Sequence, residues 1–181
     1  MNCEPMEIIQ IIRPMRGGSQ ARLVKDRDGS FYVAKFTGNP QGTRILINEW
    51  FASQLFQHLR IATPPLRVLR LTRAVSAVSE DLVFHVGKTR IAVEPGLHLG
   101  SQSPVNPETT AIFDFLPQRM LSRVTNPEDF AKALVLDLFL GQTDGRQAIF
   151  VREGFGSVYR LYAYLIDHGV GAGVKVHQFC R

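Results

Sequence analysis

The sequence has few of the features that mark disulfide-rich, secreted or membrane-spanning proteins. It contains only two cysteines, Cys3 and Cys180, which rule out a disulfide framework and a cysteine-based metal knuckle. Its most apolar stretch, residues 131–141, is interrupted by Asp137 and is shorter than the roughly 20 residues that a membrane-spanning helix needs. The N-terminus lacks the basic start and apolar segment of a secretory signal. We therefore expect a cytoplasmic protein that does not insert into a membrane.

Long runs of basic residues are also missing. The net charge is +5, but the Lys and Arg residues are scattered and are not interleaved with aromatic side chains. A nucleic-acid surface is therefore the least favoured interpretation, and we expect the excess charge to handle phosphate groups. With 45% hydrophobic and 20% charged residues, the composition is typical of a folded globular protein.

The first half of the chain has the pattern of a small antiparallel sheet followed by a helix. Residues 6–13, 21–25 and 31–36 show the alternation and β-branched content of strands, and Asp28-Gly29 is a strong signal for a hairpin turn. Residues 43–59 carry apolar side chains at near-helical spacing. We predict three antiparallel strands and one long helix.

A linker is predicted where Gly, Ser and Pro accumulate between residues 94 and 107. Before it, residues 66–71 and 90–93 resemble further strands, while residues 72–88 are ambiguous. The predicted division is an N-terminal lobe over residues 1–93, a hinge and linker over 94–107, and a partial C-terminal lobe over 108–181.

The second half is predicted to hold two helices and a hairpin. Residues 109–124 look largely helical, and a second helix is expected to begin at Asn126-Pro127, with Asn as the cap, and to end near Gly141. On it, Phe130, Leu134, Asp137 and Leu138 are expected to share one face. Strands over 148–152 and 159–166 enclose a turn with Gly154 and Gly156. The fold class is therefore α+β.

Phosphoryl transfer needs a cation on the nucleotide phosphates, an anion that holds this cation, carboxylates for Mg²⁺ and a carboxylate that orients the attacking hydroxyl. Lys35 lies on the predicted third strand and Glu49 on the following helix, which is the chain order of a kinase Lys and Glu ion pair. Asp144 and Asp167 flank the predicted hairpin, so both can return to one edge of the second lobe. The four residues together favour a nucleotide-binding cleft.

A glycine loop adds a weaker signal. The segment MRGGSQA contains Gly17, Gly18 and Ser19, and its glycines remove side chains that would keep a phosphate away from the backbone N–H groups. We predict that these three residues contact the phosphates, although two glycines between strands can equally be only a turn.

The segments VAKF at Lys35, NEW at Glu49, GQTDGRQAIF at Asp144 and LIDHG at Asp167 carry a family resemblance. From about residue 16 to residue 169 the chain resembles the HipA-like kinases, a divergent branch of the protein-kinase superfamily. The resemblance implies a two-lobe kinase-like fold with ATP and Mg²⁺ as cofactors. It implies that Asp144 is the catalytic base and Asp167 the principal Mg²⁺ ligand, with Lys35 clamping the phosphates and Glu49 holding Lys35. It also implies that Glu94 lies in the hinge whose backbone meets the adenine.

The sequence departs from the kinase pattern at two places. Ile149 stands five residues after Asp144, where kinases supply a metal-binding Asn. Gln147 offers an amide oxygen and is the favoured substitute, with Gln142 a poorer candidate. Few residues follow Gly169, so the second lobe is expected to be reduced, part of a longer chain, or covered by another subunit of a homo-oligomer.

Each of these residues also has an ordinary structural interpretation. Taken alone, Lys35 is more often a solvated strand residue, and Asp144 is as often a turn former as a catalytic group. Trp50 and Phe51 are expected to be core residues, and His168 and His177 structural or solvated. It is the order of the four charged residues that favours chemistry.

The first hypothesis is therefore an ATP-dependent kinase that phosphorylates a Ser, Thr or small-molecule hydroxyl. The alternative is a catalytically impaired pseudokinase, or a nucleotide-binding interaction module. The acceptor, whether protein or small molecule, is not identified by the sequence.

Overall fold

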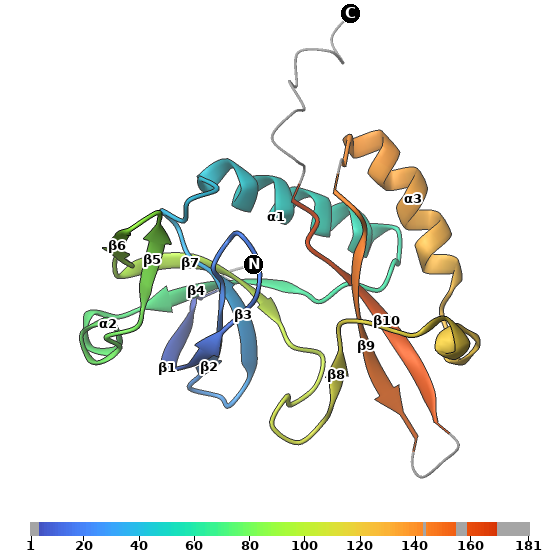
Figure 1. The fold of residues 1–181 in the computed structure, drawn as a ribbon, viewed down its shortest axis with the longest axis horizontal. Helices are drawn as coiled ribbons and strands as arrows, with labels where there is room; N and C mark the ends of the chain where they lie inside the picture. Colours follow the sequence, from blue (N-terminus) through green and yellow to red (C-terminus); the bar gives the residue numbers. More distant parts are fainter. Residues whose placement is uncertain (1–3, 143, 155–158, 170–181) are drawn as a thin grey trace, which may run out of the picture. The chain divides into compact units, whose positions relative to one another are not determined.

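The protein is a mixed α+β structure, rich in sheet and with few helices (Figure 1). The computed structural model describes residues 4–142, 144–154 and 159–169. Cys3, Gly156, His177 and Cys180, which the sequence analysis discussed, lie outside the described residues. The chain divides into two compact units, which contain the described parts of residues 1–46 with 64–109 and of residues 47–63 with 110–181. None of the helices in the described part of the chain is long and apolar enough to cross a bilayer.

The first unit is built on a closed five-stranded barrel. Its strands follow the order β1-β2-β3-β7-β4, and β1 closes the barrel by pairing in parallel with β4. The β2–β3 hairpin turns at Gly29, whose φ of 82° is in the left-handed region that glycine tolerates. The prediction of three antiparallel strands is confirmed. The barrel strands are β1 (Met6–Pro14), β2 (Arg22–Asp26), β3 (Phe31–Lys35), β4 (Leu66–Leu71) and β7 (Gly96–Gln102).

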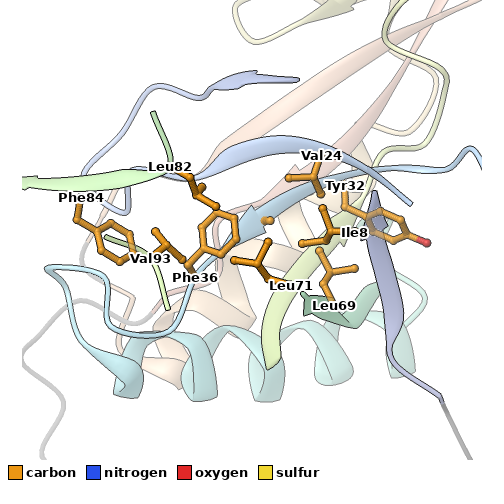
Figure 2. Packing of buried hydrophobic residues seen from close by; sticks show 10 residues of the cluster. Ile8, Val24, Tyr32, Phe36, Leu69, Leu71, Leu82, Phe84 and Val93 are labelled. Carbon is orange, nitrogen blue, oxygen red and sulfur yellow. The ribbon is translucent and has the colours of Figure 1, made fainter. Parts of the chain in front are cut away.

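Large apolar side chains fill the core of this unit. Figure 2 shows Phe36 between Leu82, Phe84 and Val93 on one side and the side chains of the barrel strands on the other. Tyr32 is the polar member of the cluster, and its hydroxyl donates to Asp26 Oδ2 at 3.0 Å. Burial, helped by this hydrogen bond, raises the pKa of Tyr32 to about 12. The polar group of this cluster therefore has a partner.

Residues 72–88, which were ambiguous in sequence, form helix α2 (Arg73–Val78) and strand β5 (Val83–Val86). Strand β5 pairs with β6 (Thr89–Ala92) in a separate hairpin. The predicted linker over residues 94–107 needs a correction, because most of its first half is strand β7, which lies between β3 and β4 in the barrel. Gly96 and Gly100 suggested a loop, but Leu69 of β4 packs directly over Gly100, where a Cβ would lie 2.4 Å from the Leu69 side chain. The glycine here permits close packing.

Helix α1 (Thr43–His58) is the long helix expected after the third strand. It begins in the first unit, where Leu46 packs with Leu66 and Leu99, and continues in the second. Trp50 and Phe51 are 39% and 58% exposed, so their assignment to the core is wrong. The buried positions of the helix are instead Leu46, Glu49, Ala52, Ser53 and Phe56.

The second unit has a three-stranded antiparallel sheet in the order β10-β9-β8. Residues 109–124 were expected to be largely helical, but they contain the short strand β8 (Ile112–Phe113) and a 3₁₀-helix (Gln118–Arg123). Pro117 lies directly before the 3₁₀-helix. Because proline cannot lie within a helix without disrupting it, the helical part of this segment begins only after Pro117. The sheet is completed by β9 (Gln147–Glu153) and β10 (Arg160–Ile166), close to their predicted positions.

Helix α3 (Glu128–Leu140) ends as predicted at Gly141, which has a φ of 66°. Its predicted face is wrong, because Leu134 and Leu138 are 61% and 76% exposed while Ala133 and Leu136 are buried. Asn126 does not cap the helix. Its side-chain amide pairs with both backbone groups of Ala163 on β10, each at 2.9 Å.

Candidate functional site

The glycine loop connects β1 to β2 and is closed by the Met15 N–H, which donates to the Ala21 carbonyl at 2.9 Å. Gly17 has a φ of 120°, which is accessible to glycine and strained for other residues. A Cβ on Gly18 would lie 2.9 Å from the Gln41 side chain. Gly17 and Gly18 are exposed and Ser19 is half-buried. The loop is therefore a compact turn whose backbone a phosphate can approach.

Two residues that the sequence analysis missed hold this loop against strand β5. The Gln20 side chain accepts from the His85 N–H at 2.8 Å and donates to the His85 carbonyl at 2.7 Å. The Arg22 guanidinium donates to the carbonyls of Gln20 and Val83, and burial lowers its pKa from the usual value. No sequence signal identifies the contacts to His85 and Val83, because they join residues 65 and 61 positions apart in the chain.

Lys35 ends strand β3, where it pairs with Leu99 of β7 and is half-buried. Glu49 lies on α1 and is only 4% exposed. Lys35 belongs to the first unit and Glu49 to the second, so their predicted ion pair stays a prediction. Glu94 is exposed and lies in the turn before β7. The first unit continues through β7 to residue 109, and the place of Glu94 in a hinge and its contact with adenine also stay predictions.

Asp144 and Asp167 lie at the same end of the β9–β10 hairpin. Gln147, the first residue of β9, pairs with Ile166, the last residue of β10. Asp144 comes three residues before this pair and is exposed, and Asp167 follows it directly. The register therefore returns both carboxylates to one edge of the sheet, as the spacing predicted.

The residues around Asp167 have the donor chemistry that Mg²⁺ prefers. Gln147 Nε2 donates to Asp167 Oδ2 at 3.3 Å, whereas Ile149 is within β9, paired with Tyr164. Among the described residues, the buried Gln142 Oε1 has no hydrogen-bond partner, while its Nε2 donates to the Asp167 carbonyl. Carboxylate and amide oxygens suit Mg²⁺. A cluster of three or more His, Cys, Asp or Glu side chains does not occur in the described ranges, so any metal here would depend on amide and phosphate oxygens as well.

Asp167 has a φ of 55°, a left-handed conformation that is uncommon for a residue other than glycine. Such strain costs on the order of 1–3 kcal/mol and persists only where the surroundings enforce it. The groups on either side of Asp167 are both contacted by Arg146, which the sequence analysis did not single out. His168 is 4% exposed, which confirms a structural position for this histidine.

The comparisons with known proteins decide the family. The model for HipA-like kinases matches residues 8–104, more than half of the 181-residue chain. The chain belongs to the HipA-like kinase family. A search of curated proteins finds no match.

Membership in the HipA-like kinase family supports a kinase-like, transferase function. The matched residues cover the glycine loop, Lys35 and Glu49, together with most of the first unit. Asp144 and Asp167 lie beyond the match, so their roles depend on the hairpin geometry and the motifs around them.

Proposed function

We propose that this HipA-like kinase uses ATP to phosphorylate a hydroxyl group, with its two units as the two lobes of a kinase-like fold. In this proposal the glycine loop and Lys35 hold the phosphates from the first unit, and Glu49 holds Lys35 in place. Asp144 and Asp167 act from the second unit. The acceptor is a Ser or Thr side chain or a small-molecule hydroxyl.

The observation that carries the proposal is the pairing of Gln147 with Ile166. It brings Gln147 Nε2 to 3.3 Å from Asp167 Oδ2, and in this proposal Gln147 takes the place of Ile149, which cannot bind a metal. The amide oxygen of Gln147 and the carboxylate of Asp167 would hold Mg²⁺. When bound, Mg²⁺ would neutralise charge on the phosphate oxygens.

Asp144 is suited to the role of base because it is exposed on the turn before β9. An exposed carboxylate at this edge can accept a hydrogen bond from an incoming hydroxyl and orient its oxygen towards the γ-phosphate. The proton of that hydroxyl passes to the Asp144 carboxylate as the new phosphate ester forms, while the bond between the γ-phosphorus and the β–γ bridging oxygen breaks and ADP leaves. Positioning supplies most of the rate enhancement in this reaction class.

Transfer of the γ-phosphate tests this function. The full chain is incubated with labelled ATP, Mg²⁺ and either itself or pooled peptide and sugar acceptors, and Asp144→Asn is compared with the wild type. Loss of a catalytic carboxylate should lower the rate by about 10²-fold or more. Asp114→Asn is the matched control, since Asp114 is an exposed carboxylate elsewhere in the same unit. Equal rates in wild type and Asp144→Asn would remove Asp144 from the mechanism.

A non-catalytic nucleotide-binding module is the second candidate, favoured by the position of Ile149 inside β9, where kinases supply a metal ligand. A thermal-shift titration with ATP and Mg²⁺ separates the two candidates. A bound nucleotide raises the melting temperature in proportion to the logarithm of its concentration above Kd. Binding without transfer supports the module, and the absence of both rejects the nucleotide site.

A further inference from the structure

One guanidinium in the second unit joins segments that are distant in sequence. Arg146 donates from Nε to Asp137 Oδ2 at 2.9 Å and from Nη2 to Asp137 Oδ1, so the pair with helix α3 is bidentate. Both side chains are largely buried, at 13% and 12% exposed. The Arg146 guanidinium carbon also lies 5.0 Å from the centre of the Phe56 ring on α1. The orientation of this side chain is therefore determined by its partners.

The remaining nitrogen, Nη1, contacts both neighbours of Asp167. It donates to the Ile166 carbonyl at 3.1 Å and lies 2.9 Å from Nδ1 of His168. Arginine only donates hydrogen bonds, so Nδ1 of His168 must accept and the neutral ring must carry its hydrogen on Nε2. Nε2 then donates to the Thr63 hydroxyl at 2.7 Å, which in turn donates to the Leu165 carbonyl at 2.9 Å. The contacts form a directional chain around the end of β10.

These contacts bracket a strained residue. Asp167, between Ile166 and His168, is the one with a φ of 55°. Gln142 adds a third contact by donating to the Asp167 carbonyl at 3.4 Å. The backbone is thus held at the carbonyls of Ile166 and Asp167, and the residue after Asp167 is held through its imidazole ring. In this conformation its carboxylate reaches the Gln147 amide.

We infer that Arg146 is a positioning residue that keeps the Asp167 carboxylate aimed at the Gln147 amide for a divalent cation. This inference rests on the proposed function, because it assigns a cation to Asp167. Arg146 itself does not bind the cation. It is two residues after Asp144 in the chain, so the same guanidinium links the turn that carries Asp144 to the residue that would hold the metal.

Two variants remove the contacts of Arg146 to Ile166 and His168 without leaving Asp137 as an unpaired buried charge. Arg146→Lys keeps a cation for Asp137, but a single ammonium cannot reproduce the fork to Asp137, Ile166 and His168. The double variant Asp137→Leu/Arg146→Met replaces the whole pair with apolar side chains, a change that is often neutral for stability. Lys132→Met is the matched control, since it breaks the ion pair with Asp129 on the same helix.

The test uses Mn²⁺ as a paramagnetic probe and the full chain saturated with a non-hydrolysable ATP analogue. The readout is the Mn²⁺ concentration that half-broadens the NMR signal of the Gln147 side-chain amide. We expect both variants to need about 10-fold to 100-fold more Mn²⁺, the usual effect of losing a residue that orients a metal ligand. The Lys132→Met control should match the wild type.

A second readout needs no metal. At neutral pH, nitrogen NMR of His168 should show the Nε2–H tautomer in the wild type and a mixture of tautomers in both variants. Wild-type Mn²⁺ response in a folded Arg146→Lys or double variant would overturn the inference. If Mn²⁺ broadens the Gln147 signal in the wild type but no phosphate is transferred, the kinase proposal alone is rejected. If Mn²⁺ causes no broadening in the wild type, the metal site and the inference are both rejected.

Discussion

The two units position their candidate site residues by different means. In the first, Lys35 is held by backbone ladders, since β3 is paired on both sides within a closed barrel. In the second, Asp167 lies just beyond the last strand pair, where Gln142 contacts its carbonyl and Arg146 contacts its two neighbours. The register of a backbone ladder is set by the alternation of apolar and polar residues and by the turns between strands. A side-chain contact, by contrast, is lost when one residue is replaced. We therefore expect the first site to tolerate substitution around it and the second to be sensitive.

Core truncations give the largest effects and test whether the units are energetically separate. Phe36→Ala in the first core and Leu165→Ala in the second both remove completely buried side chains. We expect losses of about 3–5 and 2–5 kcal/mol in the free energy of unfolding. Hydrogen exchange should show faster exchange mainly in the unit that carries the substitution. Equal acceleration in both units after either change would contradict their separation.

Acid should weaken the two units in different pH windows. Burial lowers the pKa of His98 in β7 to about 4 from an ordinary 6.5. Between pH 6.5 and pH 4 His98 is protonated in the unfolded chain but not in the folded barrel. The free energy of unfolding therefore decreases by about 3 kcal/mol as the pH is lowered through this range. Measurement of unfolding by urea from pH 7 to pH 4 checks the slope. His98→Gln, which can still accept from the Thr37 N–H, should abolish most of it.

In the second unit, Asp129 should lose its contribution to stability at a lower pH than His98 does. Burial by itself would raise the pKa of Asp129, but hydrogen bonds from Asn126, the Ala62 N–H and Lys132 outweigh it and hold the pKa below 3.8. A depressed carboxyl pKa stabilises the folded state above the unfolded pKa and loses this contribution as pH falls through the folded value. If amides of the second unit lost their protection from hydrogen exchange between pH 6.5 and pH 4, a group other than Asp129 would control the acid response of this unit.

Buried hydrogen bonds come next in size. Asn126→Ala removes both bonds to the Ala163 backbone and one to Asp129, and should cost about 2–3 kcal/mol. Tyr32→Phe removes one bond to Asp26, which keeps the Ser30 N–H as a partner, and should cost about 1 kcal/mol. Chemical denaturation measures both. If Tyr32→Phe lowered the free energy of unfolding more than Asn126→Ala does, the first unit would be the one that depends more on single side-chain contacts, against the contrast proposed above.

The same contrast explains which predictions from sequence are confirmed. Strands β1, β2, β3, β4 and β6 and the β9–β10 hairpin follow alternation and turn signals, and they are close to their predicted positions. Strand β7 was taken for a linker because Gly96 and Gly100 resemble loop residues, although Gly100 is needed for Leu69 to pack. Its pairing with β3 and β4 is a long-range contact that local composition does not encode.

At the candidate site, Asp144, Asp167 and Gln147 were predictable because motif and hairpin spacing place them at one edge. Arg146 was not, because nothing in GQTDGRQ indicates that its guanidinium reaches Asp137 nine residues earlier and the carbonyl before Asp167. The exposed Leu134 and Leu138 misled the prediction of the α3 face, since apolar periodicity does not say which face is buried.

Ion pairs at the surface should have the smallest effect and should not differ between the units. Glu7→Gln breaks the pair with Arg27, whose side chains are 38% and 74% exposed, and Lys132→Met breaks the pair with the buried Asp129 from a half-exposed position. Solvent screening limits each loss to less than about 1 kcal/mol, and Asp129 keeps its bonds from Asn126 and Ala62. Urea titrations at low and high salt would measure both. A loss above 2 kcal/mol for Lys132→Met alone would mean that the side-chain network of the second unit extends to its surface, so that its sensitivity is not confined to the surroundings of Asp167.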